Sequence, residues 1–220
     1  MHPLATGRVP RSHTFPDRLL AALDAGLRTV FTPTRAARPS PALGIAEGNL
    51  GKAAIQEAGS LMRVNHVGEI CAQALYQSQA LFSRTDELRR QFEHASAEEL
   101  DHLAWTAERV AELGTHTSRL APVWWAGAFA WGSVAGLAGD RWSLGFVVET
   151  ERQVEAHLAS HIDKLPADDL ASRAIVEQMK QEEAAHADAA LAAGALPLPG
   201  VVRDLMRAAA KVMTTVAHRV

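Results

Sequence analysis

Apolar residues recur every three or four positions through most of this chain, with polar or charged residues between them. This period is typical of amphipathic α-helices that bury one face. Proline and glycine residues separate the periodic segments, as expected for turns and connectors. The pattern predicts helices over residues 17–31, 60–83, 86–114, 144–158, 170–194 and 201–220. We therefore expect an all-α protein.

Two of these helices carry the same short motif. Glu99 and His102 form one Glu-x-x-His, and Glu183 and His186 form the other. Residues three apart share a helix face, so each motif directs a carboxylate and an imidazole toward one point. One such motif is common on a solvated helix, but a repeated one is more specific.

Each motif follows another glutamate at a similar distance. Glu69 lies 30 residues before Glu99, and Glu151 lies 32 residues before Glu183. A spacing near 30 fits two helices of about 20 residues joined by a short turn. Two Glu and two Glu-x-x-His from four helices are the ligands of ferritin-like dinuclear carboxylate proteins. The sequence therefore predicts a ferritin-like four-helix bundle of two helical hairpins, each supplying half of a metal site.

Neighbouring glutamates are alternative candidates for these ligand positions, and the helix face on which each lies distinguishes them. Glu99 lies on an apolar face, whereas Glu98 aligns with Asp101 on a face that we expect to be solvated. Glu151 shares its face with valine and leucine residues, and Glu149 points about 200° away. Glu99 and Glu151 are therefore the inward residues.

In the last bundle helix, Glu182 could also reach His186, and the parallel with the first motif favours Glu183. The candidate metal ligands are Glu69, Glu99, His102, Glu151, Glu183 and His186. Four carboxylates match the charge of two divalent cations, with Glu99 and Glu183 as the natural bridging pair. Oxygen-rich ligands with one histidine per metal suit iron or manganese and argue against a structural zinc site.

Residues 120–139 form a run of twenty residues without a charge. Its length would allow it to cross a membrane. A single crossing, however, would separate the two hairpins and prevent the four glutamates from meeting. We therefore expect a long apolar crossover along the bundle, with Gly132 and Gly136 as a close-packing face. Trp124, Trp125 and Trp131 indicate that the crossover meets lipid or another subunit.

The flanking segments are less specific. Proline-rich residues 1–50 predict an N-terminal arm with one short helix, capped by Asp17. Residues 51–220 are expected to form the bundle, and the whole chain a single domain. The C-terminal helix over 201–220 is either a core-facing or a basic interfacial helix. Near the N-terminus no apolar core of a secretory signal is found.

Composition narrows the possible partners. The net charge is −3 and no basic run occurs, so nucleic-acid binding is not expected. The single cysteine, Cys71, excludes an internal disulfide and fits a reducing compartment.

Two segments carry a resemblance to a known family. Residues 61–69, with the sequence LMRVNHVGE, and the following Tyr76 resemble the signature of the demethoxyubiquinone hydroxylases. Residues 149–158, with the sequence ETERQVEAHL, are similar to another segment of that family. The resemblance extends over most of the chain from Leu61 onward. It places two iron ions on the same six ligands and implies that Tyr76 and His157 lie near the centre, beside the ligands or in proton handling.

The resemblance implies a monooxygenase of ubiquinone biosynthesis. Its substrates would be O₂ and a 6-methoxy-3-methyl-2-polyprenyl-1,4-benzoquinol, with an electron donor. A polyprenyl substrate is almost insoluble in water, so we expect a peripheral protein on the cytoplasmic face of the inner membrane. Further copies of the chain or other proteins of ubiquinone biosynthesis are possible partners.

Two other functions use a similar site. A ferritin-type iron store or ferroxidase would have no use for an apolar, tryptophan-rich crossover. A ferritin-like hydroxylase of another, soluble substrate is the stronger alternative from the residues alone. A metal-free membrane-binding bundle would leave four inward glutamates without compensating charge.

Overall fold

The computed structural model describes residues 14–46 and 48–220, and all regular elements in these ranges are α-helices. They are α1 (Phe15–Phe31), α2 (Lys52–Phe82), α3 (Asp86–Glu112), α4 (Ala121–Ala138), α5 (Asp140–Lys164), α6 (Leu170–Ala192) and α7 (Gly200–Ala217). The all-α prediction is confirmed. Most of the predicted proline-rich start of the arm, residues 1–13, lies outside the described residues.

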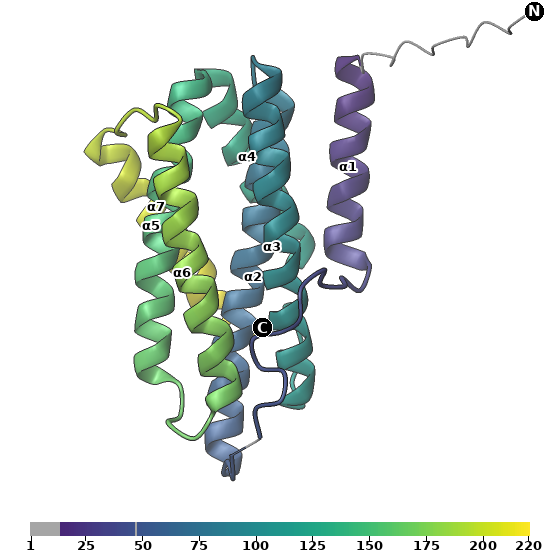
Figure 1. Cartoon of the computed structure of the whole chain (residues 1–220), viewed down its shortest axis with the longest axis vertical. Helices are drawn as coiled ribbons and strands as arrows, with labels where there is room; N and C mark the ends of the chain where they lie inside the picture. Colours follow the sequence, from purple (N-terminus) through teal and green to yellow (C-terminus); the bar gives the residue numbers. More distant parts are fainter. Residues whose placement is uncertain (1–13, 47) are drawn as a thin grey trace, which may run out of the picture.

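Two antiparallel hairpins form the bundle (Figure 1). α2 packs against α3 and α5 packs against α6, while contacts of α2 with α5 and of α3 with α6 join the pairs. One buried apolar cluster includes Met62 and Met179, and a second includes Phe92 and Val147. In all four helices the predicted ligands fall between residues of these two clusters. The ferritin-like bundle of two hairpins is therefore confirmed.

The first bundle helix is longer than predicted. α2 begins at Lys52, eight residues before the expected start at Ser60. Ala58 is fully buried, and Ile55 packs against the cluster around Met62. Good helix formers fill these extra turns, and their core contacts stabilise a segment that periodicity alone did not assign.

Thr14, and not Asp17, is the N-cap of α1. The Thr14 hydroxyl accepts a hydrogen bond from the Asp17 backbone N–H, and the Asp17 carboxylate accepts one from the Thr14 N–H at 2.9 Å. This reciprocal pair is a capping box, and Pro16 occupies the first turn, where no N–H is needed. The predicted cap was therefore three residues too late. α1 packs against α2 and α4.

The uncharged segment forms α4, which lies along α2 as the predicted crossover between the hairpins (Figure 1). A Cβ at Gly132 would lie 2.1 Å from the Ser78 hydroxyl, and one at Gly136 would lie 2.8 Å from Cβ of Phe82. The close-packing role of these two glycines is confirmed. α4 meets α5 at Gly139, whose φ of 115° is in the region that favours glycine.

The tryptophans of α4 face other helices more than expected for membrane anchors. Trp124 and Trp125 are half-buried and donate their indole N–H groups to Ser118 and Gln77. Trp131 is also half-buried and packs against Phe146. The exposed apolar side chains of this helix are aliphatic instead: Val123 (59%), Val134 (69%) and Leu137 (62%).

α1, α4 and α7 make one outer layer over α2. α1 contacts α4, and α4 and α7 share two apolar clusters. The outer faces of α1 and α7 also expose large apolar side chains: Leu20, Leu27 and Phe31 on α1, and Val201, Leu205 and Val212 on α7. Among the described residues, none of the helices has the length and apolar character needed to span a bilayer.

Candidate metal centre

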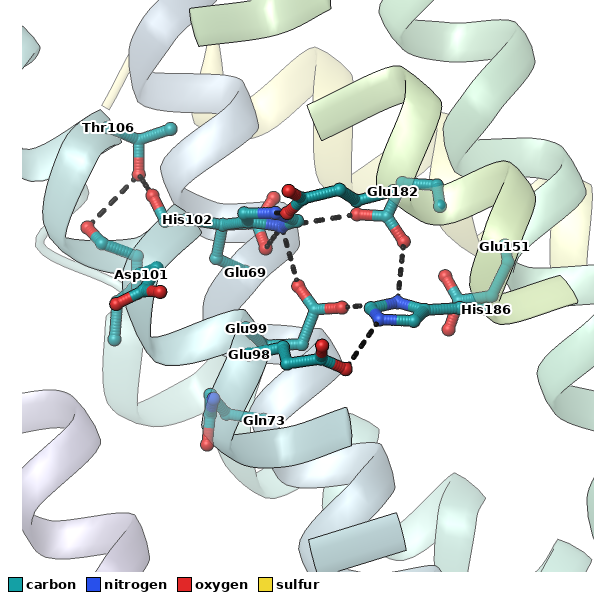
Figure 2. A network of polar contacts seen from close by, with 12 residues as sticks. Glu69, Gln73, Glu98, Glu99, Asp101, His102, Thr106, Glu151, Glu182 and His186 are labelled. Carbon is teal, nitrogen blue, oxygen red and sulfur yellow. Dashed lines mark hydrogen bonds and ion pairs between the residues drawn. The ribbon is translucent and has the colours of Figure 1, made fainter. Parts of the chain in front are cut away.

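Helices α2, α3, α5 and α6 bring all six predicted ligands together in the bundle. Figure 2 labels Glu69, Glu99, His102, Glu151 and His186 among them. They form two overlapping groups, in each of which the ligand atoms lie within 4.8 Å of one another. One group is Glu69, Glu99, His102 and Glu183, and the other is Glu151, Glu183 and His186. All except the partly buried His186 are buried.

Two glutamates stand between the histidines. The oxygens of Glu99 lie 2.9 Å from Nδ1 of His102 and 3.0 Å from Nδ1 of His186. The oxygens of Glu183 lie 3.5 Å and 3.7 Å from the same two nitrogens. Both carboxylates therefore face both halves of the centre, as the predicted bridging pair requires.

The protonation of these side chains reflects crowded carboxylates in a dry interior. Burial raises the pKa of Glu69 well above its usual range, and the charge of Glu99 raises it further. Burial also raises the pKa of Glu151. Burial would do the same to the pKa of Glu99, but the nearby imidazoles, His102 above all, outweigh it and hold that pKa well below its usual range. Ionisation of Glu69 and Glu151 is therefore unfavourable at this centre unless positive charge is added.

Several buried ligand atoms lack hydrogen-bond partners. Oε2 of Glu69 and Oε2 of Glu183 have none among the described residues. Buried polar atoms are normally paired, because leaving them unpaired costs about 1–3 kcal/mol each. Divalent cations would satisfy these atoms and offset the carboxylate charge. The residues present therefore fit a dinuclear metal centre.

The outer nitrogen of each histidine faces a carboxylate from the opposite hairpin. Nε2 of His102 lies 2.6 Å from Glu182, and Nε2 of His186 lies 3.2 Å from Glu98 (Figure 2). Such partners orient a metal-bound imidazole and raise its basicity. Glu182 is thus aimed at His102 and not at His186, the residue that its spacing suggested.

The connector between α1 and α2 reaches the same network. The backbone N–H of Ala37 donates to Asp101 at 2.6 Å, and the Arg38 guanidinium contacts both Asp101 and Glu182. Asp101 is buried, so the expectation that it shares a solvated face with Glu98 is wrong. The backbone of the connector supplies the hydrogen bonds that make its burial possible.

Tyr76 lies beside the ligands. Its hydroxyl donates a hydrogen bond to Glu151 at 2.6 Å, and the side chain is buried. Tyr76 also lines a cleft of about 1330 Å³ between α1 and the α2–α3 hairpin. Burial, followed by the charge of Glu151, raises the pKa of Tyr76 well above its usual value, so the phenol keeps its proton. The residue can therefore donate a hydrogen bond at the centre and connect it to the cleft.

His157 occupies a different place. Its ring centroid lies 4.0 Å from that of His161, one turn further along α5. In the described part of the chain, it belongs to neither group of candidate ligands. Burial and the charge of Lys164 lower the pKa of His157 to about 4, so its imidazole is neutral near pH 7. The geometry supports Tyr76 more directly than His157 as a residue that acts on the centre.

Comparison with known proteins agrees with this arrangement. The family model described as ubiquinone biosynthesis protein COQ7 matches residues 56–217. The chain belongs to the COQ7 family. The matched range includes all six candidate ligands, Tyr76 and His157.

Curated relatives match along nearly their whole length. A protein of Polaromonas naphthalenivorans is 59% identical over 204 residues, which cover 93% of this chain and 98% of the relative. One of Variovorax paradoxus is 58% identical with the same coverage, and one of Methylibium petroleiphilum is 56% identical over 96% of this chain and 100% of its own. Each of the three is named 3-demethoxyubiquinol 3-hydroxylase.

In this COQ7-family chain, sequence reasoning missed the outer partners of the histidines. Glu98 and Glu182 immediately precede Glu99 and Glu183, so the doubled glutamate in both motifs was the available signal. Arg38 left no such signal, because it acts across 63 residues on Asp101 and 144 residues on Glu182.

Proposed function

We propose that this chain is an O₂-dependent di-iron monooxygenase that hydroxylates demethoxyubiquinol, a 6-methoxy-3-methyl-2-polyprenyl-1,4-benzoquinol, in ubiquinone biosynthesis. One oxygen atom enters a ring C–H bond and yields a hydroxyl group. The second leaves as water with two electrons and two protons from a donor. The curated relatives named 3-demethoxyubiquinol 3-hydroxylase support this assignment of the substrate.

The observation that carries the proposal is the buried Glu/His cluster at the middle of the bundle. Glu69 and His102 would hold one iron ion, Glu151 and His186 the other, and Glu99 and Glu183 would bridge them. When bound, reduced iron supplies the electron transfer to O₂ that no protein side chain provides. Iron and manganese both accept this ligand type, and iron is proposed because the reaction consumes O₂.

The side chains around the cluster do the remaining work. Glu98 and Glu182 orient the two imidazoles, and Tyr76 holds a proton beside Glu151. The apolar clusters on either side exclude water from the centre. Exclusion of water strengthens the electrostatic interactions of the ligands and protects reactive species from side reactions.

We further propose that the protein is peripheral on the cytoplasmic face of the inner membrane, where a polyprenyl quinol resides. The support is the layer of α1, α4 and α7, whose outer faces carry exposed aliphatic and aromatic side chains. Exposed apolar area of this kind is costly in water and is buried in the headgroup region of a bilayer.

Turnover of a defined quinol tests the activity. Iron-loaded protein is incubated with a short-tailed demethoxyubiquinol, O₂ and a chemical reductant, and the product is identified by mass spectrometry with isotopically labelled O₂. We expect one labelled oxygen per product with wild type and none with Glu183→Ala. Oxidation of Fe(II) without hydroxylation would instead indicate a ferroxidase, and hydroxylation of only a different, soluble ring would indicate a hydroxylase of another substrate.

A further inference from the structure

The connector between α1 and α2 fastens one half of the centre. The Arg38 guanidinium contacts Asp101 of α3 with Nε at 2.5 Å. Its two other nitrogens contact Glu182 of α6 at 2.6 Å and 2.9 Å. One arginine therefore joins two helices through a two-pronged contact that a lysine cannot reproduce.

The fastened carboxylate is the one that touches His102. Oε2 of Glu182 lies 2.6 Å from Nε2 of His102, and Gln178 donates a further hydrogen bond to Glu182 at 2.6 Å. The chain of contacts therefore runs from Arg38 through Glu182 to a candidate metal ligand. Glu182 has little freedom to move away from the imidazole.

An aromatic ring holds Arg38 from a second direction. The guanidinium lies 5.0 Å from the ring centroid of Trp105, and the Trp105 indole N–H donates to the Arg38 carbonyl. The same ring is 5.5 Å from that of His102. The Arg38 side chain is itself 42% exposed, but the cation–π contact and the two ion pairs hold it, and the Glu182 carboxylate that it contacts is only 19% exposed.

The other half of the centre is open by comparison. Glu98, which faces His186, has a side chain that is 41% exposed, and its further contact is with exposed His94 at 3.8 Å. His186 itself is 12% exposed, whereas His102 is fully buried. Exposed carboxylates keep rotamer freedom and are screened by water, so they constrain their partners less.

From this asymmetry we propose that Arg38 is a positioning residue that makes the half-site of Glu69 and His102 the tighter of two unequal metal positions. The inference rests on the dinuclear centre proposed above. A fixed partner at the outer nitrogen holds the imidazole in place for the metal, and loss of such partners typically lowers metal affinity 10–100-fold. The metal at His102 is therefore retained first, and the metal at His186 binds last and leaves first.

Metal titration of the full-length protein tests the proposal without turnover. Chelator-treated protein is titrated with Fe(II) under anaerobic conditions by equilibrium dialysis. For wild type we expect two separated binding steps. Arg38→Ala should weaken the first step by roughly 10- to 100-fold, and Arg38→Lys should restore only part of the loss because it cannot contact both carboxylates.

Two further variants make the assignment specific. Glu98→Gln should change mainly the second step, because Glu98 faces His186. Arg28→Ala removes an exposed arginine that pairs with Asp24 on the same helix, α1, and should leave both steps unchanged. Circular dichroism verifies that each variant is folded. If Arg38→Ala does not fold, Glu182→Gln is used in its place.

Mn(II) electron paramagnetic resonance gives a second measurement. With unequal positions, one equivalent of Mn(II) should produce an isolated-ion signal, and the second equivalent should convert it to the signal of a coupled pair. The proposal would be overturned if wild type bound metal with equal affinity in both steps. It would also be overturned if folded Arg38→Ala and Glu182→Gln kept the metal affinity of the wild-type first step. Failure of wild type to bind metal would overturn the dinuclear centre as well.

Discussion

Glu182 lies 2.6 Å from Nε2 of His102, although the two residues belong to different hairpins and are 80 positions apart. The reciprocal contact joins Glu98 of the first hairpin to His186 of the second. Each hairpin thus completes the surroundings of the other's histidine. Loss of either hairpin's geometry would therefore disturb both halves of the centre.

The central glutamates should be needed for both metal ions. Glu99 and Glu183 face both histidines, so Glu99→Ala or Glu183→Ala should remove the paired-iron spectrum and lower iron content from about two ions per chain to less than one. Elemental analysis and Mössbauer spectroscopy of protein produced in iron-rich medium measure this. A full complement of coupled iron in both variants would exclude the assigned ligands.

Substitution of Glu151 should reduce quinol hydroxylation much more than substitution of Glu149. Glu151 is buried and accepts a hydrogen bond from Tyr76, whereas the partly buried Glu149 contacts Gln153 and Arg207. Glu151→Gln should reduce quinol hydroxylation by at least about 100-fold, and Glu149→Gln by less than about threefold. Equal rates in the two variants would show that the wrong face of α5 had been assigned.

Tyr76→Phe should separate activity from metal content. The substitution removes the hydrogen bond to Glu151 and leaves the ring in its apolar cluster. We expect iron content to stay near that of wild type, while the rate of hydroxylation falls about 100- to 10,000-fold, the usual contribution of a positioned general acid or base. This role of the hydroxyl would be refuted if Tyr76→Phe turned over at the wild-type rate with an unchanged dependence on pH.

His66 should make the fold sensitive to acid. Burial lowers its pKa from 6.5 to about 4, so the unfolded chain binds a proton below pH 6.5 that the folded chain rejects until about pH 4. Stability contributed by the neutral imidazole is therefore present above pH 6.5 and is lost as the pH falls toward 4. At about 1.4 kcal/mol per pKa unit, this amounts to roughly 3 kcal/mol.

Urea unfolding at pH 7 and pH 4.5 measures the effect. His66→Gln should lose less stability than wild type between these two pH values. His94→Gln, at an exposed position, is the matched control and should follow wild type. An unchanged difference for His66→Gln would mean that the imidazole is protonated in the folded protein.

The outer layer should carry membrane binding. Val134, Leu137, Val201 and Leu205 are more than half exposed on α4 and α7. Replacing all four with serine should release the protein from liposomes and impair turnover of a long-tailed quinol much more than of a short-tailed one. Serine at exposed Leu43, on the connector, is the control. Continued liposome binding by the fourfold variant would favour another membrane-facing surface.

The bundle and the six candidate ligands could be predicted because their signals are local. Helical period selected inward residues, and the spacing from Glu69 to Glu99 and from Glu151 to Glu183 defined two hairpins. The start of α2 at Lys52 could not be derived this way, because its first turns depend on tertiary contacts of Ile55.

Long-range contacts account for the other differences. Burial of Asp101 depends on Ala37 and Arg38, which approach it only when the connector is laid across α3. The exposed side of α4 likewise depends on which helices cover it. Composition therefore predicted Trp124 as an outward-facing residue, whereas the fold exposes Val134. Neither arrangement leaves a periodic pattern in the sequence.

The junction at Gly139 divides the candidate ligands equally. Glu69, Glu99 and His102 precede it, and the other three follow it. If the chain were cleaved there, each fragment would carry three of the six candidate ligands. Each would also carry the carboxylate that contacts the imidazole of the other fragment. Dinuclear metal would then act as a cross-link between two separate polypeptides, and fragment complementation would become a direct gauge of metal occupancy.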